Sequence, residues 1–172
     1  EDKLPGYNDD LGQSPELELE TYKDLSLLEW DIQHLPNSPE MEIGAIVLDP
    51  LRDTVSQASN LIRLTHNVAA VHRDVEASPY SQRLVYGGHT VALAQASLSR
   101  MFPDLASIVG WHICDHLGPV FEGDLLSFQH KPVQEISAGN GRLVALQVKA
   151  FAHRKNSESI EVLDWVPIIF IR

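Results

Sequence analysis

The chain has 172 residues, and its 13 Lys and Arg against 24 Asp and Glu give a net charge of −11 at pH 7. Proteins that bind nucleic acid need a basic surface that displaces counterions, so a pI near 5.0 argues against nucleic acid as a partner. No apolar run approaches the roughly 18 residues of a membrane span, so we expect no membrane partner. Hydrophobic residues make up 44% of the chain, which suits one globular domain plus an appendage.

The negative charge is concentrated at one end of the chain. Residues 1–50 hold two lysines and thirteen carboxylates, whereas residues 51–172 have no net charge and hold seven of the eight histidines. Residues 1–40 also contain several Pro and Gly, and only one short amphipathic stretch. We therefore predict an acidic linker or wrapping arm over 1–40 and the folded functional domain over 41–172.

The cysteine content and the first residues bear on the location of the protein. Cys114 is the single cysteine, so the chain forms no internal disulfide, and the start Glu-Asp-Lys-Leu-Pro lacks the basic and apolar regions of a signal peptide. These features predict a cytoplasmic protein. The absence of an initiator Met indicates a piece of a longer protein or an arbitrary boundary.

The first half of the domain predicts mostly short elements. Residues 43–48 are apolar and β-prone, which indicates a short strand. Residues 56–65 carry apolar side chains at helical spacing behind Ser56, a residue that can cap a helix N-terminus, so a short helix is expected there. Residues 66–83 are polar and contain Pro79, which predicts a loop.

The second half predicts one long helix and several long strands. The Gly87-Gly88 pair is followed by an apolar-rich stretch from Val91 to Met101 that is closed by Pro103 and is apolar on nearly all sides, so a buried helix of about four turns is expected. Residues 108–113, 125–133, 143–151 and 160–171 predict strands, with a turn at 139–141. A long helix followed by antiparallel strands with short turns indicates an α+β domain in which one sheet wraps around one helix.

The polar segment from residue 64 to residue 74 holds the first candidate catalytic residues. His72 lies at the end of this segment, and imidazole is a suitable general base because its unperturbed pKa is about 6.5. Asn67, five residues earlier, is placed to hold the same water molecule. The alternative is a loop histidine without a catalytic role.

A second candidate lies at the start of the long helix, in Tyr86-Gly87-Gly88-His89. Glycines allow close backbone approach, and the first N–H groups of a helix are unpaired and lie at the positive end of its dipole, so this turn can bind a developing oxyanion. The alternative is that the two glycines only make a sharp turn into the helix. Phosphate-binding and dinucleotide-binding glycine motifs are both missing from the sequence.

The third candidate is a set of potential metal ligands in the strand-like segment after residue 108. His112, Cys114 and His116 would point to one face of a strand, which is compatible with zinc. No second ligand group with recognisable spacing accompanies them, so we predict no metal and no other cofactor. Cys114 is expected to be a small buried hydrophobe rather than a nucleophile, and no Gly-x-Ser-x-Gly motif is present.

Taken in order, these segments resemble the MaoC-like acyl dehydratases, a hotdog-fold family that includes the (R)-specific enoyl-CoA hydratases. The family loop Gly-Asp-x-Asn-Pro-x-His is matched by Asn67 and His72 at the same spacing. The family turn Val-His-Gly is matched by residues 85–87, and Pro-Val-x-x-Gly-Asp by residues 119–124. The resemblance covers about residues 42–172 and implies a hotdog fold.

Residues 82–89, Gln-Arg-Leu-Val-Tyr-Gly-Gly-His, are most similar to the C-terminal hotdog of double-hotdog members such as mesaconyl-CoA hydratase. This resemblance implies hydration of a trans-2-enoyl-CoA to a (R)-3-hydroxyacyl-CoA, or the reverse dehydration. Asn67 and His72 would hold the water, and Tyr86, Gly87, Gly88 and His89 would bind the thioester. It also implies a homodimer or pairing with an N-terminal hotdog half, with residues 1–40 as the connector after that half.

The sequence departs from the family loop at Asn67, which replaces Asp, at His66, which stands where the family has Gly, and in lacking the family's Asn-Pro. Asn67 replaces the family's Asp and removes a carboxylate, so His72 would carry the proton alone. This change leaves open a non-catalytic hotdog subunit that binds acyl thioesters or completes a partner's site. A thioesterase is a further alternative, although residues 86–95 lack the carboxylate which that chemistry generally uses. The candidates for binding CoA phosphates are Arg63, Arg73, Arg83 and Arg100.

Overall fold

The computed structural model describes residues 15–38 and 40–172, and the predictions for residues 1–14 lie outside this range. Two short 3₁₀ helices come first, η1 (Leu19–Tyr22) and η2 (Ser26–Glu29). Two short strands and three helices follow, namely β1 (Val47–Leu48), β2 (Asp53–Thr54), α1 (Ala58–Leu64), α2 (Ala70–Arg73) and α3 (Gly87–Met101). Four long strands complete the chain, β3 (Leu105–His116), β4 (Leu125–Ala138), β5 (Gly141–His153) and β6 (Ile160–Ile171).

The strands form one antiparallel sheet in the order β1-β4-β5-β6-β3, with β2 also paired to β4. The predicted turn between β4 and β5 is present, and Gly139 there has a φ of +54°. A side chain at Gly139 would clash with the backbone of Leu28, so this tight approach requires glycine. Strand β3 pairs with β6 alone among the described residues and leaves a long free edge.

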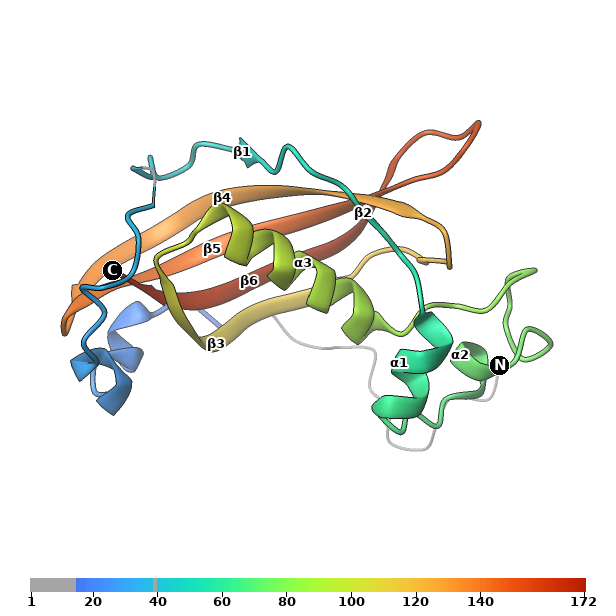
Figure 1. The fold of residues 1–172 in the computed structure, drawn as a ribbon, viewed down its shortest axis with the longest axis horizontal. Helices are drawn as coiled ribbons and strands as arrows, with labels where there is room; N and C mark the ends of the chain where they lie inside the picture. The colour runs from blue at the N-terminus through green and yellow to red at the C-terminus, as the bar shows by residue number, and fades with distance from the viewer. Residues whose placement is uncertain (1–14, 39) are drawn as a thin grey trace.

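Helix α3 lies along one face of the curved sheet (Figure 1). Val91, Ala94 and Leu98 are buried against apolar side chains of the strands, and each fully buried side chain of Leu size contributes about 1.5–3 kcal/mol to folding. The predicted burial of α3 holds for the face turned to the sheet, whereas Ala92 and Gln95 on the other face are exposed. A single sheet covers only one side of the helix. No described helix combines the length and the hydrophobicity needed to cross a membrane.

The opposite face of the sheet is covered by the segment that contains η1 and η2. Leu19, Leu28 and Ile32 are buried there against Ile168 and Phe170 of β6. Strand β6 therefore has apolar neighbours on both faces, which explains why residues 165–171 are almost continuously hydrophobic. The described part of the predicted acidic arm thus packs against the domain.

Two local predictions need correction. Ser56 does not cap α1, because the helix begins at Ala58 after Gln57 with a φ of 61°. The Ala58 N–H is instead bonded to the Glu122 carboxylate at 3.0 Å, a partner 64 residues away. The segment predicted as a loop between 66 and 83 also contains one short helix, α2.

Candidate active site

His72 lies near the end of α2 with one ring nitrogen engaged. Its Nδ1 is 2.8 Å from the carbonyl oxygen of Leu84. A carbonyl only accepts hydrogen bonds, so Nδ1 carries the proton and the neutral imidazole presents Nε2 as an acceptor. The Tyr86 ring packs edge-on against the His72 ring with 5.9 Å between centroids. This arrangement gives a half-buried imidazole whose Nε2 can take a proton.

Three neighbouring hollows share His72 in their walls. The first, of about 250 Å³, is lined by His72, Leu84, Val85, Gly87, Thr90, His116, Gly118 and Val120. The second, of about 230 Å³, adds Glu122 and Gln82, and the third, of about 200 Å³, adds Arg63 and Arg73. His72 therefore faces an apolar hollow at the start of α3 and, beside it, spaces lined by charged groups.

The start of α3 presents unpaired N–H groups to the first hollow. The His89 N–H donates to the Tyr86 carbonyl at 2.8 Å, but Gly87 and Gly88 come too early in the helix to have an acceptor within it. A Cβ added at Gly87 would lie 2.6 Å from Nε2 of His116, and one at Gly88 would lie 2.5 Å from Cε1 of Tyr86. A side chain at either position would therefore displace the ring of His116 or Tyr86 that packs on the backbone.

Of the six site residues singled out from sequence, His72 and Gly87 line these hollows, whereas Asn67, Tyr86, Gly88 and His89 do not. Asn67 lines none of the three, and its Oδ1 accepts a hydrogen bond from the Ala69 N–H at 2.9 Å. His89 is half-buried, and its Nδ1 has no hydrogen-bond partner in the described part of the chain. Burial lowers the pKa of His89, while Glu122 opposes this shift.

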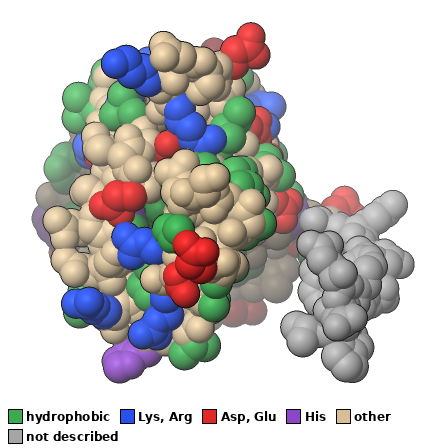
Figure 2. All heavy atoms as spheres, turned by 90° about the vertical axis from the view of Figure 1, so that its right-hand side faces the viewer, with side chains coloured by type: hydrophobic (Ala, Val, Ile, Leu, Met, Phe, Trp, Pro, Cys, Tyr) green, Lys and Arg blue, Asp and Glu red, His purple; other side chains and the backbone are tan. Residues whose placement is uncertain are grey.

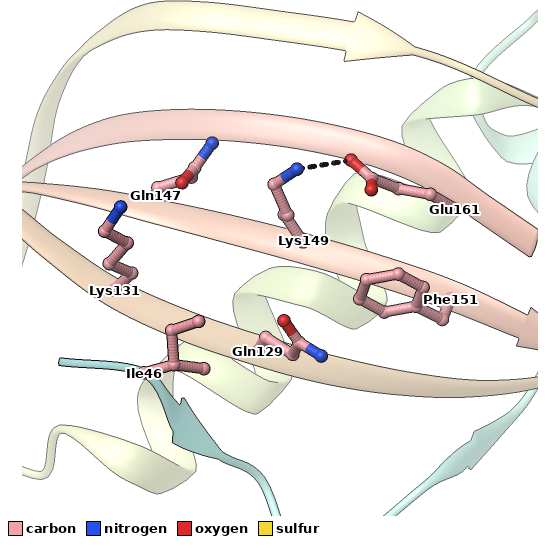
Figure 3. Close-up of a pocket in the computed structure, with 7 residues that line it drawn as sticks. All are labelled: Ile46, Gln129, Lys131, Gln147, Lys149, Phe151 and Glu161. Carbon is pink, nitrogen blue, oxygen red and sulfur yellow. Dashed lines mark hydrogen bonds and ion pairs between the residues drawn. The ribbon is translucent and has the colours of Figure 1, made fainter. Parts of the chain in front are cut away.

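A larger hollow, of about 380 Å³, lies on the outer face of the sheet. Figure 3 shows its side chains with α3 behind the sheet, so this hollow is separated from the start of the helix. Its one carboxylate, Glu161, is paired with Lys149 at 2.8 Å, and the rest of the lining is Ile46, Gln129, Lys131, Gln147 and Phe151. No unpaired general base lines this hollow, so it is a poor reaction site despite its size.

Comparison with known proteins bears on this geometry. No family model matches the chain. Over 107 residues it is 27% identical to mesaconyl-CoA hydratase of Cereibacter sphaeroides, covering 61% of the chain and 31% of that protein. It is 34% identical, with a TM-score of 0.72, to a conserved hypothetical double-hotdog protein of Mycobacterium tuberculosis, covering 81% of the chain and 43% of that one. A putative MaoC domain dehydratase of Chloroflexus aurantiacus shows 19% identity and a TM-score of 0.69, covering 76% and 42%.

The chain has the hotdog fold. The predicted α+β class, with an antiparallel sheet wrapped around one long helix, is confirmed, and so is the resemblance to MaoC-like dehydratases and hydratases. The chain spans less than half the length of each of these three proteins.

Two residues of this hotdog domain were missed as site residues by sequence reasoning. His116 was grouped with His112 and Cys114, but it lines the hollow of His72, whereas His112 lines a separate hollow with residues 15–22. Glu122 sits at one of the unspecified positions of the matched 119–124 motif and lines the second hollow. In the described ranges, no three His, Cys, Asp or Glu side chains are arranged to hold a metal ion.

Cys114 is a poor nucleophile in this hotdog domain. Burial raises the pKa of its thiol, and the neighbouring Asp115 raises it further, so the thiolate is disfavoured. The thiol is half-buried on β3, in contact with the core on the α3 side.

Proposed function

We propose that this domain hydrates a trans-2-enoyl thioester to a (R)-3-hydroxyacyl thioester, or catalyses the reverse dehydration. The observation that carries the proposal is the first hollow, of about 250 Å³, which is lined by both His72, with its Nε2 left as an acceptor, and Gly87, the first residue of α3. A base and an oxyanion-binding group on one apolar hollow suit addition of water to a conjugated carbonyl.

The mechanism follows from these two groups. His72 Nε2 takes a proton from water while the water oxygen bonds to C3, and the electrons of the double bond shift toward the thioester oxygen. The N–H groups of Gly87 and Gly88 stabilise the resulting enolate, with Tyr86 and His89 proposed as further substrate-binding groups. His72 then returns the proton to C2, so the overall reaction adds one water molecule.

The role of Asn67 is narrower in this mechanism than that of the family's Asp. Its Oδ1 is held by the Ala69 N–H, and its backbone oxygen accepts from Arg73 at 3.2 Å, so Asn67 fixes the turn that carries His72. Because Asn67 lines none of the hollows around His72, the mechanism gives it no contact with the water. His72 therefore moves the proton in both directions.

The charges beside His72 support CoA as the thioester carrier. Arg63, Arg73 and Arg83 line the third hollow, next to the first, and none of them forms a salt bridge within the described residues. Figure 2 shows basic side chains gathered on the lower part of this end of the molecule, at the level of α1 and α2 in Figure 1. Arg100 is removed from the candidates because it is paired with Asp49 and Asp53.

The free edge of β3 supports pairing with a second hotdog. A 12-residue edge strand with unpaired N–H and C=O groups and a half-exposed Trp111 needs cover. The proposed partner is an identical chain or an N-terminal hotdog half.

A single assay tests the proposed chemistry against its alternatives. The full-length protein is incubated with trans-2-enoyl-CoA while the conjugated absorbance, the free thiol and the configuration of the product are followed. Loss of absorbance without thiol release, with a (R)-3-hydroxyacyl product, supports the hydratase. Thiol release favours a thioesterase, for which Glu122 supplies a carboxylate beside His72. Binding without either change favours a non-catalytic acyl-binding subunit.

A further inference from the structure

The first hollow contains a second imidazole that the mechanism above leaves unused. His116 lies at the end of β3 and lines this hollow together with His72, Gly87 and Thr90. The remaining lining is apolar or glycine, so the two imidazoles, the Thr90 hydroxyl and the helix N–H groups are its polar groups.

The His116 ring lies directly against the start of α3. Its Nε2, Cε1 and Cδ2 would be 2.6, 2.7 and 3.1 Å from a Cβ placed on Gly87, so the edge of the ring occupies the space that a side chain would fill. Neither ring nitrogen of His116 makes a hydrogen bond within residues 15–38 and 40–172. The imidazole therefore lies beside Gly87, the first residue of the helix, with its own N–H available.

The surroundings favour a neutral His116. Partial burial of the ring lowers its pKa, and Asp115, on the neighbouring position of β3, opposes this shift. The positive end of the α3 dipole also disfavours a second positive charge there. The other titratable group on this hollow is His72, which is neutral when its Nε2 acts as an acceptor. A neutral imidazole keeps one N–H to donate.

We propose that His116 is a catalytic residue of the same site, whose Nε2–H donates a hydrogen bond to the thioester carbonyl oxygen beside the N–H groups of Gly87 and Gly88. This inference rests on the proposed function and adds a side-chain donor to its oxyanion site. During hydration the Nε2–H stays on His116 and strengthens its bond as charge develops on the oxygen. The proton from water still passes to His72 and from there to C2, so no further reactant is needed.

The test compares two substitutions in the full-length protein. His116→Phe keeps a flat ring but removes the donor, and we expect kcat for enoyl-CoA hydration to fall about 10- to 100-fold with KM changed by less than about 3-fold. His116→Gln restores an N–H donor, and we expect it to recover kcat to within about 10-fold of wild type. His112→Phe, on the same strand but lining a separate hollow, is the matched control and should leave both constants near wild type.

A spectroscopic measurement separates a chemical role from a structural one. The infrared carbonyl band of bound butyryl-CoA, labelled at the thioester carbon, should lie at lower frequency on the wild-type protein than in solution, and the shift should be smaller on His116→Phe. A wild-type kcat in His116→Phe, or an equal carbonyl shift in both proteins, overturns this role of His116 alone. Failure of the wild-type protein to hydrate any enoyl-CoA instead overturns the proposed function and this inference with it.

Discussion

The two ends of α3 place polar groups in opposite ways. At its start, Gly87 lines a hollow, and the first N–H groups of the helix have no acceptor within it. Near its end, the Ser97 hydroxyl donates to Asp49 at 2.6 Å and lies 2.9 Å from Nε2 of His130, and all three side chains are buried. The first end leaves polar groups unpaired within reach of a ligand, whereas the second pairs them away from solvent. We infer that the first end carries the chemistry and the second holds the helix on the sheet.

The largest effect is expected from the base at the first end. Replacing His72 by Ala should lower kcat for enoyl-CoA hydration by about 10²- to 10⁴-fold, because the proposed mechanism assigns both proton transfers to His72. The unfolding midpoint in urea should change little, since His72 is only half-buried. A wild-type kcat in the His72→Ala protein would show that the reaction does not take place at the start of α3.

Substitutions near the C-terminal end of α3 should lower the stability of the protein rather than its activity. The Asp49 side chain is buried and accepts from Ser97 and from Arg100 at 2.6 Å, so Asp49→Asn leaves Arg100 without its buried partner. We expect the free energy of unfolding to fall by about 2–4 kcal/mol, with kcat of the folded protein near wild type. The matched control Asp53→Asn, at a more exposed partner of Arg100, should cost under about 1 kcal/mol. If Asp49→Asn lowers kcat instead of stability, the contrast between the ends is wrong.

Acidification should also destabilise the buried polar network near the C-terminal end of α3. Burial lowers the pKa of His130 to about 4, with Arg100 adding to this shift and Asp49 opposing it. The unfolded state binds a proton near pH 6.5 and the folded state only near pH 4, so stability is complete above pH 6.5 and falls as the pH drops toward 4. This histidine should account for about 3 kcal/mol of that fall.

Unfolding in denaturant at several pH values measures the contribution of His130 to the loss of stability. The loss of stability between pH 7 and pH 4 should be smaller in His130→Gln than in the wild-type protein, because the variant lacks the titrating imidazole. Equal losses in the two proteins would show that His130 does not titrate as its burial requires.

A smaller effect is expected from the arginines beside the first end. Replacing Arg63, Arg73 or Arg83 by Gln should raise KM for an enoyl-CoA by about 3- to 10-fold each, through lost contacts with phosphate. The same substitutions should leave KM for an enoyl-pantetheine, which has no phosphate, unchanged. Arg52→Gln is the control, since Arg52 lines none of the hollows around His72. Equal effects on both thioesters would assign these arginines to folding.

Features set by neighbouring residues were predictable from the sequence. The bounds of α3 follow from Gly87-Gly88 and Pro103, and the β4–β5 hairpin follows from the turn at 139–141. The cap of α1 was not predictable, because Glu122 supplies it from 64 residues away. The position of His116 was not predictable either, because β3 contains register shifts that break the simple alternation of side chains along a strand. The network of Asp49, Ser97 and His130 joins three distant segments and left no local pattern.

The most direct test is a structure of the full-length protein with butyryl-CoA, a saturated thioester that cannot be hydrated. We predict that the thioester oxygen lies within hydrogen-bonding distance of the Gly87 or Gly88 N–H and of His116 Nε2, with the acyl C3 facing His72 Nε2. A thioester bound away from the start of α3, for example in the outer hollow beside Lys131 and Lys149, would contradict the account.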